Sequence, residues 1–214
     1  MKTVYLVRHG QTDANIYEYA QGAEEPLNDT GWRQAYAVAE RAQNLNFEVI
    51  ISSDMKRAVQ TAHAIAEATK RQVITEPLLR EVCYPEDLNG YDESGDKAAR
   101  KEQFRKELLE NLDNPDWHAY GVENQVALVA RAQQVLQFLE EREEEKLLIV
   151  SHGNFLKTLV GHIIMGISEV SGSQGFRFRR SLKLDNTGLS TITFDEEERR
   201  WSLYQWNDRA HFAE

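Results

Sequence analysis

The chain has 214 residues, of which 41% are hydrophobic and 28% are charged, proportions typical of one globular domain. Its 25 basic and 35 acidic residues give a net charge of −10, which disfavours nucleic acids and anionic membranes as partners because both bind cationic surfaces. No apolar run approaches the roughly 20 residues of a membrane span. The one cysteine, Cys83, allows no intrachain disulfide. We therefore expect a single cytoplasmic domain over residues 1–214.

Three short apolar segments are expected to form buried strands, and each runs directly into a polar turn. They are residues 3–7, 47–51 and 147–150. Helical patterns accompany them, at residues 32–45, 55–69, 123–145 and 154–167. Short apolar strands that alternate with helices are typical of an α/β fold, because parallel strands need a crossover connection. The sequence therefore predicts a mostly parallel sheet flanked by helices.

Two further regions extend this α/β pattern. Residues 89–121 are highly charged but carry an apolar stripe at Phe104, Leu108, Leu109 and Leu112, and we interpret them as a helical insertion lying over the sheet. Four more short segments are expected to be strands, the last two of them joined as a hairpin: 72–75, 181–184, 189–194 and 201–206.

The polar turns after the three apolar segments carry chemically active side chains. The first is Arg8-His9-Gly10, the second is Ser52-Ser53-Asp54 with Arg57 close behind, and the third is Ser151-His152-Gly153. Ligands of open α/β sheets bind outside the carboxyl ends of the strands, so these turns are expected to face one another. Two imidazoles beside two guanidiniums suit a phosphate, whose oxygens match the arginine fork. The same arginines would repel a divalent cation, so we expect neither a metal nor another cofactor.

The motifs RHGQTDAN, SSDMKRAVQTA, LLRE and SHG, in this order, resemble the histidine phosphatase superfamily, whose best-known branch is the phosphoglycerate mutases. The resemblance implies a three-layer sandwich with a mostly parallel central sheet and a helical insertion over the active site. It also implies a reaction that needs no metal and proceeds through a phosphorylated histidine.

The resemblance assigns roles position by position. His9 matches the nucleophile, and Glu81 matches the acid that protonates the leaving group. The groups that bind the phosphoryl oxygens are matched by Arg8, Asn15, Arg57 and His152. Gln21 and Gly22 stand where family members often contact the substrate. A neutral His9 also needs an acceptor for its second ring nitrogen, and we expect a backbone carbonyl near Gly10 to serve.

The chain departs from the family pattern at two places. The loop after Glu81 contains Pro85 and several acidic residues, which leaves the exact position of the proton donor open. Asn154 follows the SHG turn where a small residue is common, and it either reaches the pocket or caps the next helix.

These residues favour a phosphatase that acts on a small phosphorylated metabolite. A phosphoglycerate mutase-type phosphotransferase is the second reading, because both activities use the same site. A non-catalytic phosphate-binding protein of the same fold is the third. The sequence leaves the substrate's identity and the oligomeric state open, with a homodimer as one alternative.

Overall fold

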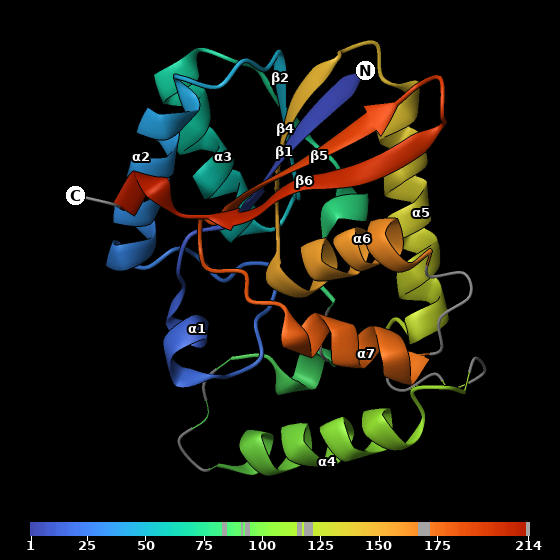
Figure 1. Ribbon diagram of the computed structural model, residues 1–214. Coiled ribbons are helices and arrows are strands. Elements are labelled where there is room, and N and C mark those ends of the chain that lie inside the picture. Colours follow the sequence, from blue (N-terminus) through green and yellow to red (C-terminus); the bar gives the residue numbers. More distant parts are fainter. Residues whose placement is uncertain are drawn as a thin grey trace.

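The computed structural model describes residues 1–82, 85–90, 92, 95–114, 117, 122–166 and 172–212 (Figure 1). Within these residues six strands form one sheet in the order β3-β2-β4-β1-β5-β6. The strands are β1 (Lys2–Arg8), β2 (Val49–Ser52), β3 (Val73–Thr75), β4 (Lys146–Ser151), β5 (Leu189–Asp195) and β6 (Arg200–Asp208). β1 to β4 pair in parallel, whereas β5 and β6 form an antiparallel hairpin at the edge. The predicted mostly parallel sheet is confirmed.

Helices cover both faces of this sheet, as Figure 1 shows with α2 and α3 on one side and α5 and α6 on the other. The helices of the described residues are α1 (Asp13–Tyr17), α2 (Asp29–Ala42), α3 (Lys56–Thr69), α4 (Asp96–Glu110), α5 (Gln125–Glu141), α6 (Gly153–Met165) and α7 (Gly172–Ser181), with short 3-10 turns η1 (Pro77–Leu79), η2 (Glu86–Leu88) and η4 (Ala210–Phe212). The predicted three-layer sandwich is therefore present.

The strands are apolar on both faces because each face packs against a helix layer. Successive side chains of a strand point to opposite faces. Leu6 of β1 and Ile149 of β4 pack toward α5 and α6, whereas Val7 packs toward α2 and α3. This explains why the central strands read as continuous apolar runs rather than as alternating patterns.

The carboxyl ends of the central strands lie level with one another. Arg8 at the end of β1 pairs with Ser151 at the end of β4, and Ser52 at the end of β2 pairs with Val150. The ladder continues one residue further, since the His9 N–H donates to the Ser151 carbonyl at 2.9 Å and the Ser53 N–H donates to Val150 at 2.9 Å. The three polar turns therefore lie side by side.

The region 89–121 contains α4, which lies beyond the carboxyl ends of the strands, below α1 and α7 in Figure 1. Phe104 of the predicted apolar stripe is buried with Ala20, Leu88 and Val122, whereas Leu109 is exposed. Residues 91, 93–94, 115–116 and 118–121 of this region lie outside the described residues, as does Cys83.

The expected strand at 181–184 is wrong. Ser181 ends α7, and the chain from 182 to 184 is irregular. The carbonyl of Leu184 does not pair with a strand, because it accepts a hydrogen bond from the Arg8 guanidinium at 2.6 Å. The short helices α1 and α7 were not expected from the sequence either. The hairpin of β5 and β6 is confirmed.

Candidate active site

The turn after β1 places His9 against the turn after β4. The imidazole rings of His9 and His152 lie 5.0 Å apart between centroids, and both side chains are buried. Gly10 allows this turn to approach α2, since a Cβ at Gly10 would lie 2.5 Å from the Gly31 carbonyl oxygen. The two histidines that are 143 positions apart in the sequence thus share one site.

The hydrogen bonds of His9 define which ring nitrogen holds the proton. Nδ1 lies 2.7 Å from the Gly10 carbonyl oxygen, which can only accept, so Nδ1 carries the hydrogen. Nε2 lies 3.3 Å from Nε–H of Arg57, which can only donate, so Nε2 holds a lone pair. The carbonyl expected near Gly10 is present. The ring is therefore oriented with a nucleophilic nitrogen toward Arg57.

Burial keeps both histidines neutral. It lowers the pKa of His9 well below its usual value, and the charges of Arg57 and Arg8 lower it further. Burial also lowers the pKa of His152, with Arg57 as the next contributor. Desolvation is the larger cause of the low pKa of His9, and the two arginines add to it.

We expect the protein to lose stability as the pH falls below about 6.5. Below that pH the unfolded chain binds a proton at His9 and at His152, whereas the native protein does not, so acid favours unfolding. Each histidine can contribute up to about 1.4 kcal/mol per pH unit to the free energy of unfolding. Urea denaturation between pH 5 and 8 measures this slope. His152→Gln should show a shallower acid limb, and parallel curves for the two proteins would contradict the assignment.

Arg57 is held at the start of α3 by contacts on several sides. Its side chain is 1% exposed. Its Nη1 donates to the Gly22 carbonyl at 2.9 Å, and its Nη2 lies 3.3 Å from Met55 Sδ. Gly22, expected to contact substrate, thus contacts Arg57 through its carbonyl and is not among the residues that line the cavity described below.

Two buried polar atoms of the site have no hydrogen-bond partner. They are Nε of Arg8 and Nδ1 of His152, in the part of the chain that the structure describes. His152 uses its other nitrogen, Nε2, on the Ser53 hydroxyl at 2.8 Å. A buried donor without a partner, such as Nε–H of Arg8, is costly, and it indicates a site that an acceptor-rich ligand completes.

The amide of Asn15 has a defined orientation. Its Oδ1 accepts from the Thr12 backbone at 3.1 Å and from Asn186 Nδ2 at 3.2 Å. The side-chain NH₂ group is therefore the end available to an anion. Gln21 is oriented in the same way, since its Oε1 accepts from the Thr12 hydroxyl at 3.3 Å. Both side chains line the cavity.

Glu81 lies on the N-terminus of α6. Its carboxylate accepts backbone hydrogen bonds from Asn154 at 3.0 Å, Phe155 at 2.9 Å and Val82 at 2.9 Å. A helix N-terminus presents free N–H groups and a positive dipole end to such a carboxylate. These bonds place Glu81 at the wall of the cavity although the loop departs from the family pattern. His152, not Asn154, is the N-cap of α6.

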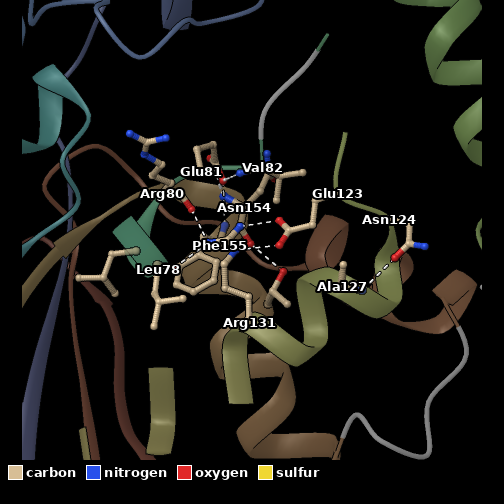
Figure 2. A network of polar contacts seen from close by, with 12 residues as sticks. Leu78, Arg80, Glu81, Val82, Glu123, Asn124, Ala127, Arg131, Asn154 and Phe155 are labelled. Carbon is tan, nitrogen blue, oxygen red and sulfur yellow. Dashed lines mark hydrogen bonds and ion pairs between the residues drawn. The ribbon is translucent and has the colours of Figure 1, made fainter. Parts of the chain in front are cut away.

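Arg131 of α5 holds the segment that carries Glu81 (Figure 2). Its Nη1 donates to the carbonyls of Leu78 at 2.7 Å and Arg80 at 2.8 Å. Glu123 accepts from Arg131 Nε at 2.8 Å and from Nη2 at 2.6 Å. The guanidinium also lies 4.3 Å from the centre of the Phe155 ring. The network ties α5, the Glu81 segment and the start of α6 together.

Replacing Arg131 with Met is expected to lower kcat by about 10- to 100-fold with little change in KM, because the Glu81 segment loses two of its hydrogen bonds and shifts. Arg142→Met is the matched control, because Arg142 is the C-cap residue of α5, pairs with Glu144 and does not line the cavity described below. Steady-state kinetics and thermal unfolding should be measured together. A fall in Tm with unchanged kcat would show that Arg131 is only structural.

One cavity of about 190 Å³ brings most of these groups together. It is lined by Arg8, His9, Asn15, Tyr19, Gln21, Arg57, Glu81, Val82, Gly153, Asn154 and Lys157. Sequence reasoning missed Tyr19, Val82 and Lys157. Lys157 stands four residues after Gly153, one helical turn into α6, and this spacing was the signal that could have found it.

The charges of this cavity suit an anion. Arg8, Arg57 and Lys157 face a single carboxylate, Glu81. Burial lowers the pKa of Lys157, and the nearby charge of Arg8 lowers it further. No group of three or more His, Cys, Asp or Glu side chains able to hold a metal ion occurs among the described residues. The basic residues of α4 do not line this cavity. Lys97 and Lys101 donate to backbone carbonyls, and Arg100 pairs with Asp87.

Comparisons with known proteins identify the family of this chain. The profile of the histidine phosphatase superfamily (branch 1) matches residues 4–209. A probable phosphoglycerate mutase of Proteus mirabilis is 36% identical over 210 residues, covering 96% of this chain and 90% of the relative. A probable phosphoglycerate mutase of Yersinia pestis is 34% identical, covering 99% and 95%.

Solved structures share the fold. A mycobacterial glucosyl-3-phosphoglycerate phosphatase superposes with a TM-score of 0.75 at 25% identity, covering 98% of this chain and all of the other. A phosphoserine phosphatase of Entamoeba histolytica gives 0.75 at 25% identity, covering 99% and 100%.

The protein belongs to the histidine phosphatase superfamily. The family implies a phosphatase or a mutase-like phosphotransferase. No helix in the described part of the chain has the length and hydropathy that a membrane crossing requires.

Proposed function

We propose that the protein is a metal-independent phosphatase that acts on a small phosphorylated metabolite through a phosphohistidine intermediate. The orientation of His9 carries this proposal. Its Nδ1 donates to the Gly10 carbonyl, which leaves the Nε2 lone pair directed toward Arg57 at the wall of an anion-binding cavity. A neutral, oriented imidazole beside two guanidiniums is what attack on a phosphomonoester requires.

In the first step His9 Nε2 attacks phosphorus. The N–P bond forms while the P–O ester bond breaks, and Glu81 gives its proton to the departing alkoxide. Arg8, Arg57, Asn15 and His152 hold the equatorial oxygens, where negative charge spreads in the transition state. In the second step Glu81 takes a proton from water as the water attacks phosphorus. The N–P bond breaks, and inorganic phosphate and the free imidazole are restored.

A mutase is the second candidate, because relatives at 34–36% identity are described as probable phosphoglycerate mutases. The chemistry differs only in the second step, where a substrate hydroxyl replaces water as acceptor of the phosphoryl group. The phosphatases that share the fold at 25% identity support the first candidate. We also propose a cytoplasmic location, and a homodimer is the assembly to test.

The experiment that separates these functions follows products in EDTA. With p-nitrophenyl phosphate, turnover that survives EDTA supports the metal-free phosphatase, and loss of turnover in EDTA contradicts it. With 3-phosphoglycerate, ³¹P NMR distinguishes released phosphate from an isomerised phosphoglycerate. Absence of turnover with every substrate, combined with binding of inorganic phosphate in calorimetry, would indicate a non-catalytic phosphate-binding protein.

A further inference from the structure

A second cavity of about 220 Å³ adjoins the first. The two cavities share two lining residues. Val82 follows Glu81 in the chain, and Asn154 lies at the start of α6. Because Glu81 is the proposed donor to the leaving oxygen, the side of the cavity next to it is where the rest of the substrate must extend. The second cavity therefore lies in the direction of the leaving group.

Apolar side chains dominate the walls of this second cavity. Phe104 and Leu108 come from α4, Val122 precedes α5, and Phe176 comes from α7. These side chains offer a hydrocarbon or ring body a surface to bury, and apolar burial contributes about 25 cal/mol per Å². The first cavity, which we call the phosphate cavity because the proposed function places the phosphate there, offers no comparable apolar surface. Most of its lining residues are charged or polar.

The charged residues around the second cavity are ion-paired or exposed to solvent, except Arg179. Glu123 is paired with Arg131, and Arg105 is paired with Glu102 on its own helix. Arg180 is exposed to solvent. Arg179 is half-buried, and its Nη1 donates at 2.8 Å to the neutral amide oxygen of Gln125.

Arg179 has no carboxylate within ion-pair distance among the described residues. Burial lowers its pKa to about 10, and the more distant charge of Glu81 opposes this shift only in part. A desolvated guanidinium without a counter-ion costs free energy, which an anionic ligand would offset.

The packing of α7 accounts for the position of Arg179. Gly172, Gly175 and Arg179 are spaced three and four residues apart, so they share one face of the helix. A Cβ on Gly172 would lie 1.7 Å from the Leu112 carbonyl oxygen, and one on Gly175 would lie 3.1 Å from Gln125 Nε2. The two glycines let α7 pack closely against Gln125, which accepts the Arg179 hydrogen bond. The guanidinium is therefore placed by backbone packing rather than by a surface ion pair.

Lys157 connects the two cavities electrostatically. It lines the phosphate cavity, and the charges of both Arg8 and Arg179 act on its ammonium group. Cationic side chains thus extend from Arg8 in the first cavity through Lys157 to Arg179 beside the apolar walls. This arrangement suits a ligand with negative charge at both ends.

We propose that the leaving group of the natural substrate has an apolar body, which fills the second cavity, and carries a carboxylate, which Arg179 binds. The inference rests on the proposed function and specifies its substrate class. One planar guanidinium matches one carboxylate in charge and in fork geometry. A second phosphate would bring about two negative charges to a place where the structure offers one half-buried arginine.

The test uses a pair of phosphomonoesters that differ only in the carboxylate. They are 4-(2-phosphooxyethyl)benzoate and its methyl ester. For the unmodified protein kcat/KM should be about 10- to 100-fold higher for the acid than for the ester, the range of a charge-assisted hydrogen-bonded pair. In Arg179→Met this preference should fall to within about threefold. Arg177→Met is the matched control, since Arg177 is exposed on the same helix and should retain the preference.

The apolar walls have their own comparison. Phe176→Ala should lower kcat/KM for the benzoate more than for phosphoglycolate, which is too short to reach those walls. Equal losses for the two substrates would contradict the apolar assignment.

The outcomes distinguish this inference from the function on which it rests. Hydrolysis of p-nitrophenyl phosphate together with equal kcat/KM for acid and ester would overturn the inference and leave the phosphatase intact. A preference for the acid that persists in Arg179→Met would overturn the role of Arg179. Absence of hydrolysis with all substrates, p-nitrophenyl phosphate included, would overturn both.

Discussion

Replacing His9 with Ala is expected to lower kcat by at least about 10⁴-fold, because the variant loses the atom that forms the bond to phosphorus. The structure offers no substitute at that position. His152, whose ring centre lies 5.0 Å away, uses Nε2 on the Ser53 hydroxyl and is not placed at the same point. Binding of phosphate should survive in the variant, since Arg8 and Arg57 remain.

The measurement is rapid mixing with ³²P-labelled substrate followed by an alkaline quench, since phosphohistidine is stable in base and labile in acid. Label should appear on the peptide that contains His9 and should be absent from His9→Ala. His63→Ala is the control, because His63 is exposed on α3, away from the cavity. Label on another residue, or near-normal turnover by His9→Ala, would contradict the nucleophile assignment.

Replacing Glu81 with Gln is expected to lower kcat/KM by about 10²–10⁴-fold for alkyl phosphates, which is the usual contribution of general acid catalysis. The effect on p-nitrophenyl phosphate should be below about tenfold, because nitrophenolate leaves without needing a proton. The dependence on the leaving group separates loss of the proton from loss of structure. Glu81 accepts backbone hydrogen bonds from Asn154 and Phe155 of α6 and from Val82. Disturbance of these contacts would lower kcat/KM equally for both substrates.

The control for Glu81 is Glu86→Gln, since Glu86 is exposed on η2 of the same loop region and does not line the cavity. Glu86→Gln should leave kcat/KM unchanged for both substrates. Circular dichroism and thermal unfolding of the two variants show whether each is folded. Equal losses for alkyl and nitrophenyl substrates in a folded Glu81→Gln would assign the proton donor to another group.

The elements that bear the site could be predicted because their signals are local. β1, β2 and β4 are short apolar runs, each ending in a polar turn. α5 forms within the predicted range 123–145, but the spacing did not identify its buried face. Val126 is exposed, and the residues that pack in the core cluster with Leu6 and Ile149 are Leu128, Ala132, Val135, Leu136 and Leu139. A parallel sheet then implies that the turns after these strands meet, and the pairing of Arg8 with Ser151 confirms it.

The strand expected at 181–184 failed for a physical reason. Alternation of polar and apolar residues over four positions is short enough to suit either an irregular segment or a strand. What decides between them is whether a neighbouring strand is available. Here the Leu184 carbonyl accepts from Arg8 instead, so the segment is held against the end of β1.

The sequence by itself determined the α/β class, the three strand ends and the presence of Arg8, His9, Arg57 and His152 at or close behind them, because hydrophobic periodicity and residue type are local properties of the sequence. Only the tertiary structure decided how these groups are oriented and what surrounds them. Arg131 reaches carbonyls 51 and 53 residues away, and Glu81 binds N–H groups 73 and 74 residues away. Arg179 lines the second cavity from α7, a helix that two glycines allow to pack closely. Such contacts depend on how whole elements pack, and no local pattern encodes them.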